Sequence, residues 1–312
     1  MLSLHAAEHS RRAPDAAPRI GLAIAGGGPV GAMYELGALR ALDEACDGLD
    51  LARLDCYVGV SSGAFFAAGL ANRMDTAELC RIFISGDSPD VSFRPETFLR
   101  PALLEYVRRA ASIPRLTAKL TQDLWSGGGD SRWSDLVTRI GGLVPTGLFD
   151  NAEVERFLRE VFTRRGRSND FRELQRPLYV IGVDLDSGEA VRFGDSGWDD
   201  VPISQAVQAS AALPGLYPPV EIFDKSGRGR HFVDGALRRT MHASVVLDRD
   251  VDLMLGINPL VPFNPGNDAD AEAESHRFSD RRIAEGGLPG VLSQTLRTML
   301  QSRMQVGLAR YA

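Results

Sequence analysis

The sequence predicts an α/β fold of three layers, with helices on both sides of a mostly parallel central sheet. Four short apolar runs are dense in β-branched residues: RIGLAIA (19–25), CYVGV (56–60), LYVIGVDL (178–185) and DLMLGI (252–257). They do not alternate apolar and polar residues, which is typical of strands buried on both faces of a parallel sheet. Helical patterns lie between them, over 30–45 and 150–162. Strands that alternate with helices predict a layered α/β fold.

Composition narrows the class of protein. The chain has 312 residues, and its 44% hydrophobic and 24% charged residues are ordinary for a globular domain. A net charge of −6 argues against nucleic acid as a partner. Three cysteines are too few for a disulfide framework and indicate a reducing compartment. The three cysteines also lack the spacing of a metal site, so we expect no metal centre.

No apolar run is long enough for a membrane span, and residues 1–18 lack the apolar core of a secretory signal. We therefore expect a mobile N-terminal extension over 1–18, a single domain over 19–312 and a cytoplasmic protein.

Three segments of this domain differ from the strand–helix pattern. Residues 94–125 combine leucines with basic residues and prolines, which predicts an inserted helical cap. Residues 262–280 are polar and acidic, which predicts a mobile loop. Residues 288–312 predict a C-terminal basic helix without acidic residues. The two basic segments could simply pack on the core, and we favour this interpretation. Alternatively, they could form a cap that makes peripheral contact with a membrane.

The stretch AIAGGGPVGAMYELGALRAL (23–42) places a glycine loop between a strand and a helix. Gly26, Gly28 and Gly31 satisfy the dinucleotide motif G-x-G-x-x-G. That motif needs an acidic residue at the end of the next strand, where this chain has GVSSG instead. A tight turn without a ligand is the other alternative, but consecutive glycines are costly in backbone entropy. Their exposed N–H groups at a helix start favour binding of a phosphate or a transient oxyanion.

The second motif identifies a candidate nucleophile. Gly59-Val60-Ser61-Ser62-Gly63 is G-x-S-x-G on a predicted strand-to-helix turn, where glycines two positions away on each side leave space for a projecting serine. A packing turn is the alternative, but this context favours Ser61 as a nucleophile. Ser62 lies beside the centre of the motif.

A serine nucleophile needs a base. His276 is the one histidine far downstream, but it falls in the acidic loop predicted over 262–280. Asp234-Gly235-Ala236 follows an apolar run, and Gly235 permits close backbone approach. Taken alone, an Asp-Gly pair indicates only a turn, yet Asp234 is the better candidate.

The order of the three motifs, G-G-G-x-x-G, G-x-S-x-G and D-G-A, resembles the patatin-like phospholipase family over about residues 19–261. The resemblance implies a Ser61–Asp234 dyad without histidine and an oxyanion hole formed by the amides of Gly26, Gly27 and Gly28. Gly31, Gly59, Gly63 and Gly235 would support these motifs. Val30 stands where the family usually has Lys or Arg, and LRRTMHASVV (237–246) replaces the family's usual Asn-Pro.

We therefore expect a serine hydrolase of lipid-like acyl esters that needs no metal or organic cofactor. A transacylase with the same dyad would be distinguished by product analysis with an added alcohol. A non-catalytic lipid-binding or regulatory protein would fail to react with a fluorophosphonate. A nucleotide-binding oxidoreductase is a third alternative, which cofactor fluorescence would reveal.

Overall fold

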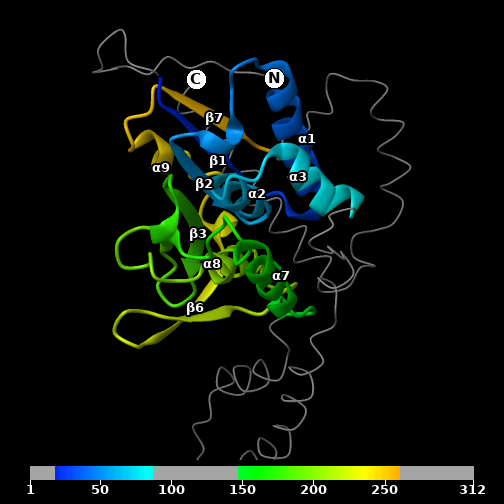
Figure 1. Cartoon of the computed structure of the whole chain (residues 1–312). Helices are drawn as coiled ribbons and strands as arrows, with labels where there is room; N and C mark the ends of the chain where they lie inside the picture. Colours follow the sequence, from blue (N-terminus) through cyan, green and yellow to red (C-terminus); the bar gives the residue numbers. More distant parts are fainter. Residues whose placement is uncertain (1–17, 87–146, 261–312) are drawn as a thin grey trace, which may run out of the picture.

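The computed structural model describes residues 18–86 and 147–260 (Figure 1). The strands are β1 (Ile20–Ile24), β2 (Cys56–Val60), β3 (Leu178–Asp184), β4 (Ala190–Phe193), β5 (Val220–Phe223), β6 (Gly229–Asp234) and β7 (Leu253–Ile257). The α-helices are α1 (Gly28–Ala45), α2 (Ser62–Ala71), α3 (Thr76–Cys80), α7 (Ala152–Phe162), α8 (Ile203–Ser210) and α9 (Ser244–Leu247). Shorter helical turns are η1 (Leu51–Arg53), η2 (Arg81–Ser85), η4 (Phe171–Glu173) and η5 (Gly235–Leu237).

All the described strands join one sheet. Its order is β5-β6-β3-β2-β1-β7, and β4 pairs with β3 outside this path. The strands β7, β1, β2 and β3 pair in parallel, whereas β4 and β6 run antiparallel to β3. Since β5 is antiparallel to β6, it has the direction of β3. Most of the described strands therefore share one direction, which confirms the mostly parallel sheet.

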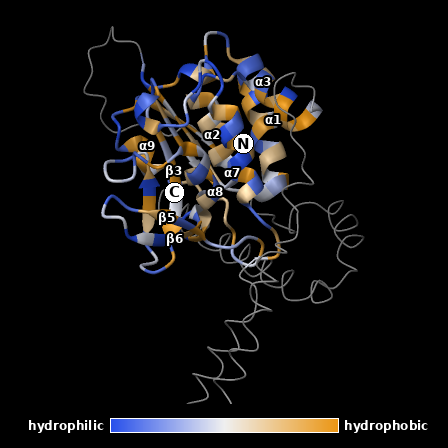
Figure 2. Cartoon of the chain, turned by 60° about the horizontal axis from the view of Figure 1, so that its bottom comes forward, coloured by the Kyte–Doolittle hydropathy of each residue, from blue (hydrophilic) through white to orange (hydrophobic). Residues whose placement is uncertain are grey.

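Helices cover the two faces of this sheet unequally in the described part of the chain. The helices α1, α2, α3, α7 and α8 cover one face, over the larger cluster of buried apolar side chains (Figure 1). The short α9 and η5 cover the other face, over a smaller cluster that includes Val58, Ile181 and Val246. Figure 2 shows hydrophilic residues gathered in the turns that connect the strands. The α/β layer fold is confirmed, with a thin second helical layer in these residues.

The pairing of β3 explains how two distant parts of the sequence meet. Gly182 pairs with Val191 of β4 and with Asp234 of β6, so β4 and β6 lie along opposite edges of β3. Ile181 pairs with Val60 of β2 and also with β4, so β2 shares an edge with β6. Along that edge β2 and β6 run toward each other and end at adjacent positions. The residues that follow β2 and end β6 are therefore brought together.

The structure confirms the four predicted strands and both predicted helices, with shifted boundaries. The helix predicted over 30–45 starts two residues earlier, at Gly28. The helix predicted over 150–162 starts at Ala152, whose N–H donates to Asp150 Oδ1 (2.9 Å). The prediction that residues 252–257 are buried on both faces is wrong, because β7 is the edge strand of the described sheet and is largely accessible.

The expectations for residues 94–125, 262–280 and 288–312, and for the N-terminal extension up to residue 17, lie outside the described residues. Within the described ranges, no helix has both the length and the apolar character needed to cross a bilayer.

Candidate active site

Ser61 occupies the sharp turn between β2 and α2. Its backbone angles are φ 51° and ψ −122°, a conformation that costs a non-glycine residue about 1–3 kcal/mol. Its N–H donates to Ser210 Oγ (2.9 Å), and the Ser210 hydroxyl donates to the carbonyl of Ile181 on β3 (2.6 Å). Ser210, at the end of α8, thus ties the strained turn to the sheet. Sequence analysis did not predict this role of Ser210, because nothing in the local sequence distinguishes it from other residues at a helix end.

The glycines around Ser61 allow close packing. A side chain on Gly63 would approach the Ile24 and Ala25 carbonyl oxygens to 2.6 Å, and one on Gly59 would approach the Gly63 carbonyl oxygen to 2.7 Å. A side chain on Gly26 would come within 2.8 Å of the Ser61 Cβ atom. These contacts explain the spacing of the second motif, because α2 must start directly against β1 and β2.

Asp234 ends β6, and its carboxylate contacts the Ser61 hydroxyl. Ser61 Oγ donates to Asp234 Oδ2 (2.7 Å), and the Ala236 N–H donates to Oδ1 (2.8 Å). Asp234 is 2% exposed, and burial raises its pKa from 3.8 to about 6 although both hydrogen bonds act in the opposite direction. A side chain on Gly235 would collide with the Ile181 carbonyl oxygen. The structure therefore brings together the two residues predicted as nucleophile and base.

The three amides predicted to form an oxyanion hole are not equivalent. Gly26 N–H donates to the Thr240 carbonyl (3.1 Å), and Gly27 N–H donates to Ser62 Oγ (2.8 Å). Gly28 begins α1, so its amide has no acceptor within the helix. Gly28 also has φ +63° and open space where a side chain would lie. Of the three, the Gly28 amide is the one placed at a helix start without an intrahelical partner.

The remaining loop glycine, Gly31, lies where α1 meets the segment after β7. A side chain there would approach Pro259 to 3.1 Å and Glu35 Oε1 to 3.4 Å, and one on Gly27 would collide with Pro259. An alanine at position 27 would therefore displace the loop, and its effect on catalysis would not report on the amide alone.

Glu35 is a second residue that sequence analysis missed. It lies on α1 with 0% exposure, and its Oε1 accepts a hydrogen bond from Ser62 Oγ (2.8 Å). Burial raises the pKa of Glu35 to about 8 against the opposing effect of that hydrogen bond. Its other oxygen, Oε2, has no partner within the described residues.

Among the described residues, the hydrogen bonds to the Asp234 carboxylate come from Ser61 and Ala236. His242 is buried and bonds to the Gly235 backbone, and burial lowers its pKa to about 4. His231 is exposed on β6, and His276 lies outside the described residues. Within residues 18–86 and 147–260, no cluster of three potential metal ligands occurs.

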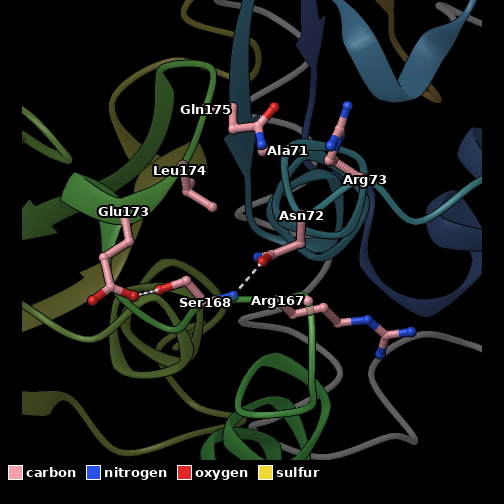
Figure 3. A pocket seen from close by; sticks show the side chains of 9 residues that line it. Ala71, Asn72, Arg73, Arg167, Ser168, Glu173, Leu174 and Gln175 are labelled. Atoms are coloured by element: carbon pink, nitrogen blue, oxygen red, sulfur yellow. Dashed lines mark hydrogen bonds between the residues drawn. The ribbon is translucent and has the colours of Figure 1, made fainter.

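A pocket of about 200 Å³ lies at the far end of α2 from Ser61 (Figure 3). Asn72 and Ser168 are joined there by a hydrogen bond from the Ser168 N–H to Asn72 Oδ1 (2.8 Å), and Ser168 Oγ donates to Glu173 (2.6 Å). Since α2 separates this pocket from the dyad by roughly 15 Å of helix, we do not assign it to the reaction.

Comparison with known proteins agrees with the motifs. The patatin-like phospholipase family matches residues 22–247, well over half of the chain. Among solved structures, VipD from Legionella pneumophila is 18% identical, with 84% of this chain and 53% of that chain covered and a TM-score of 0.40.

The type III effector ExoU is 20% identical, with 92% of this chain and 53% of that chain covered and a TM-score of 0.34. Full-length ExoU of Pseudomonas aeruginosa in complex with SpcU is 18% identical, with 62% of this chain and 38% of that chain covered and a TM-score of 0.29. The chain thus spans about half the length of these solved chains, or less. A search of curated proteins gave no match. From the family match over residues 22–247, the chain belongs to the patatin-like phospholipase family.

Proposed function

We propose that the chain hydrolyses acyl esters of lipids, with Ser61 as nucleophile and Asp234 as general base. The observation that carries the proposal is the 2.7 Å hydrogen bond from Ser61 Oγ to Asp234 Oδ2, made from a strained turn inside the protein. Strained backbone at a serine beside a carboxylate is typical of activated nucleophiles. Membership of the patatin-like phospholipase family supports the same reaction class.

In the acylation step, Asp234 accepts the Ser61 proton as Ser61 Oγ attacks the ester carbonyl carbon. Negative charge then develops on the carbonyl oxygen, and backbone amides stabilise it by about 2.7–4 kcal/mol per donor in comparable sites. The Gly28 amide at the start of α1 and the Ser62 amide at the start of α2 are the donors we assign, because helix starts favour anions. Asp234 returns the proton to the departing alcohol.

In the deacylation step, water attacks the acyl-enzyme and gives its proton to Asp234. The fatty acid leaves and Ser61 recovers its hydrogen. A single carboxylate therefore moves the proton in both steps, and neither step requires a histidine.

The acidic limb of the pH profile should follow Asp234. A base must be ionised to accept a proton, so kcat/KM should fall as pH drops through the pKa of about 6, by up to tenfold per pH unit. Initial rates of hydrolysis of a soluble p-nitrophenyl ester, measured between pH 4.5 and 8, test this pH dependence of kcat/KM. A profile that stays flat down to pH 4.5 would contradict the assignment of Asp234 as the base.

An apolar face beside the glycine loop supports a lipid-like substrate. Val30, Met33 and Tyr34 are spaced to share one side of α1, and they are 79%, 55% and 51% exposed. Val30 stands at the position where the family usually has a basic residue, so the loop offers apolar surface instead of charge. An acyl chain that covered such side chains would gain about 1.5–3 kcal/mol for each one fully buried.

Replacement of Val30 and Met33 by serine should therefore raise KM for long-chain esters several-fold and weaken sedimentation with neutral phosphatidylcholine vesicles. Hydrolysis of p-nitrophenyl acetate should change little, because its acyl chain is too short to reach this face. Phe223→Ser is the matched control, since Phe223 is 62% exposed on β5 and lies outside the glycine loop. Equal effects of both variants on long-chain KM would exclude a specific role for the α1 face.

The direct test of the function is a panel of phospholipids, triacylglycerols and p-nitrophenyl esters, assayed with the wild-type protein and with Ser61→Ala. Serine-dependent release of fatty acid from at least one lipid supports the proposal. Product analysis with an added alcohol distinguishes hydrolysis from acyl transfer.

A further inference from the structure

Glu35 is an acidic residue on the buried side of α1, beside the apolar residues Leu36 and Leu39. Its helix α1 turns Leu36 and Leu39 toward the core at 1% and 0% exposure, and Glu35 is 0% exposed. Burial of a carboxyl group is unfavourable unless hydrogen bonds compensate it, so its contacts indicate what it does.

Glu35 is connected to the glycine loop through a single hydroxyl. Ser62 Oγ donates its proton to Glu35 Oε1 (2.8 Å) and accepts the N–H of Gly27 (2.8 Å). A serine hydroxyl has one proton to donate and lone pairs to accept, so both hydrogen bonds can exist at once. These two hydrogen bonds connect Glu35 on α1, through Ser62, to Gly27 of the glycine loop.

We propose that Glu35, through Ser62, is a positioning residue that fixes the Gly27 peptide and thereby orients the Gly28 amide toward the oxyanion. This inference rests on the proposed ester hydrolysis. Without the acceptor at Glu35, the Ser62 hydroxyl is free to rotate and the Gly27 peptide loses its fixed partner. The loop amides would then be arranged only part of the time for the transition state, so kcat should fall while substrate binding changes little.

The protonation state of Glu35 makes the role measurable. With a pKa of about 8, the group is mostly neutral at pH 7 and becomes a carboxylate in mildly alkaline solution. The ionised group lies two hydrogen bonds from the Gly27 amide and would oppose the negative charge that develops on the substrate oxygen. The rate should therefore decrease as pH rises through about 8.

Other charged groups around Glu35 do not account for such a change. The adjacent α2 carries no acidic or basic side chain, and Glu78 of α3 is paired with Arg167. Further along α1, Arg40 pairs with Asp43 and Glu44. The remaining ionisable groups on these elements and at the dyad are Tyr34, which is half exposed on α1, Cys80, which ends α3, and Asp234, whose pKa is about 6.

The first test is the pH profile of kcat for wild type and Glu35→Gln between pH 6 and 10. Glutamine retains an oxygen that accepts from Ser62 but cannot ionise. The wild-type kcat should fall by roughly tenfold or more above pH 8, and Glu35→Gln should lose this alkaline limb. Glu155→Gln is the matched control, because Glu155 accepts from Ser204 Oγ (3.0 Å) on α8, away from the loop. An alkaline limb that persists in Glu35→Gln would overturn the proposal.

Two further variants separate positioning from binding. Glu35→Leu and Ser62→Ala should each lower kcat at least tenfold, with KM within about twofold of wild type. Ser62→Ala is the smaller change and reports on the loop even if Glu35→Leu does not fold. A folded Ser62→Ala protein with the same kcat as wild type would contradict the positioning role of the Ser62 hydroxyl.

Amide hydrogen exchange tests the same contact without any activity. A peptide that spans Gly26–Gly31 should exchange faster in Ser62→Ala than in wild type, whereas peptides from β3 should not change. If the wild-type protein hydrolyses no ester yet the loop exchanges faster in the variant, the proposed function fails and the structural link stands. Equal exchange in both proteins overturns the link itself.

Discussion

Ser61→Ala is expected to lower kcat for ester hydrolysis by about 10⁴-fold or more, the largest effect of any single substitution in this chain. Alanine removes the attacking oxygen and also the hydroxyl that donates to Asp234 Oδ2. The neighbouring hydroxyls of Ser62 and Ser210 cannot replace it. Ser62 Oγ is engaged with Gly27 and Glu35, and Ser210 Oγ with the Ser61 N–H and the Ile181 carbonyl. The measurement is initial-rate hydrolysis of p-nitrophenyl esters, with circular dichroism to show that the variant is folded.

Labelling with a fluorophosphonate, read by intact-protein mass spectrometry, separates the two adjacent serines. Wild type and Ser62→Ala should each take up one equivalent, the latter more slowly, whereas Ser61→Ala should take up none. Ser61→Gly should be equally inactive but about 1 kcal/mol more stable than Ser61→Ala, since glycine accepts φ 51° without strain. A labelled Ser61→Ala protein would show that another residue is the nucleophile.

The sequence was sufficient to predict the parts of the fold that depend on local pattern. The apolar run CYVGV forms β2, which is buried at every position, and Gly59 and Gly63 predicted the turn at Ser61. The same reasoning overestimated the burial of β7, since an apolar run does not reveal that its strand lies at an edge. The meeting of β2 and β6 along one edge of β3 depends on antiparallel pairing that no local pattern indicates.

The site was predictable where its residues belong to motifs and not where they act through long-range contacts. Ser61 and Asp234 each stand in a short motif, although 173 positions separate them. Ser210 and Glu35 look like ordinary helix residues, and their contacts join positions 149 and 27 residues apart. The three loop glycines were expected to act alike, but the contacts of Gly26 and Gly27 depend on Thr240 and Ser62.

Asp234→Asn is expected to reduce kcat by about 10²- to 10⁴-fold, because asparagine cannot accept the Ser61 proton. The change keeps the size of the side chain, and its oxygen can still accept from the Ala236 N–H. The loss should appear mainly in kcat, since Asp234 is buried and contacts the nucleophile. His231→Gln is the control on the same strand, and it should retain activity because His231 is exposed and three residues from the dyad.

The same substitution should increase stability, and the direction follows from the pKa. Asp234 has a folded pKa of about 6, above its ordinary value of 3.8, so the folded protein binds more protons than the unfolded chain between those values. Burial of the ionised group is therefore unfavourable above pH 6, by on the order of 2–3 kcal/mol, and this cost disappears as pH falls toward 4. Asparagine removes it, so the melting temperature should rise by on the order of 5 °C at pH 7.5 and approach that of wild type near pH 4.

Asp184→Asn, at the end of the neighbouring strand β3, is expected to have the opposite effect on stability. Asp184 is fully buried like Asp234, but it is paired with Arg230 and accepts the Asp186 N–H (2.9 Å). Its replacement leaves Arg230 without its charged partner, so this variant should be less stable than wild type while it retains activity. Thermal denaturation of all three proteins between pH 4 and 8, beside their ester hydrolysis, compares the two aspartates directly. If Asp234→Asn were destabilised at pH 7.5 as strongly as Asp184→Asn, Asp234 would be a structural carboxylate. We expect instead that Asp234→Asn is more stable than wild type and inactive, because a catalytic base is retained at a cost in stability.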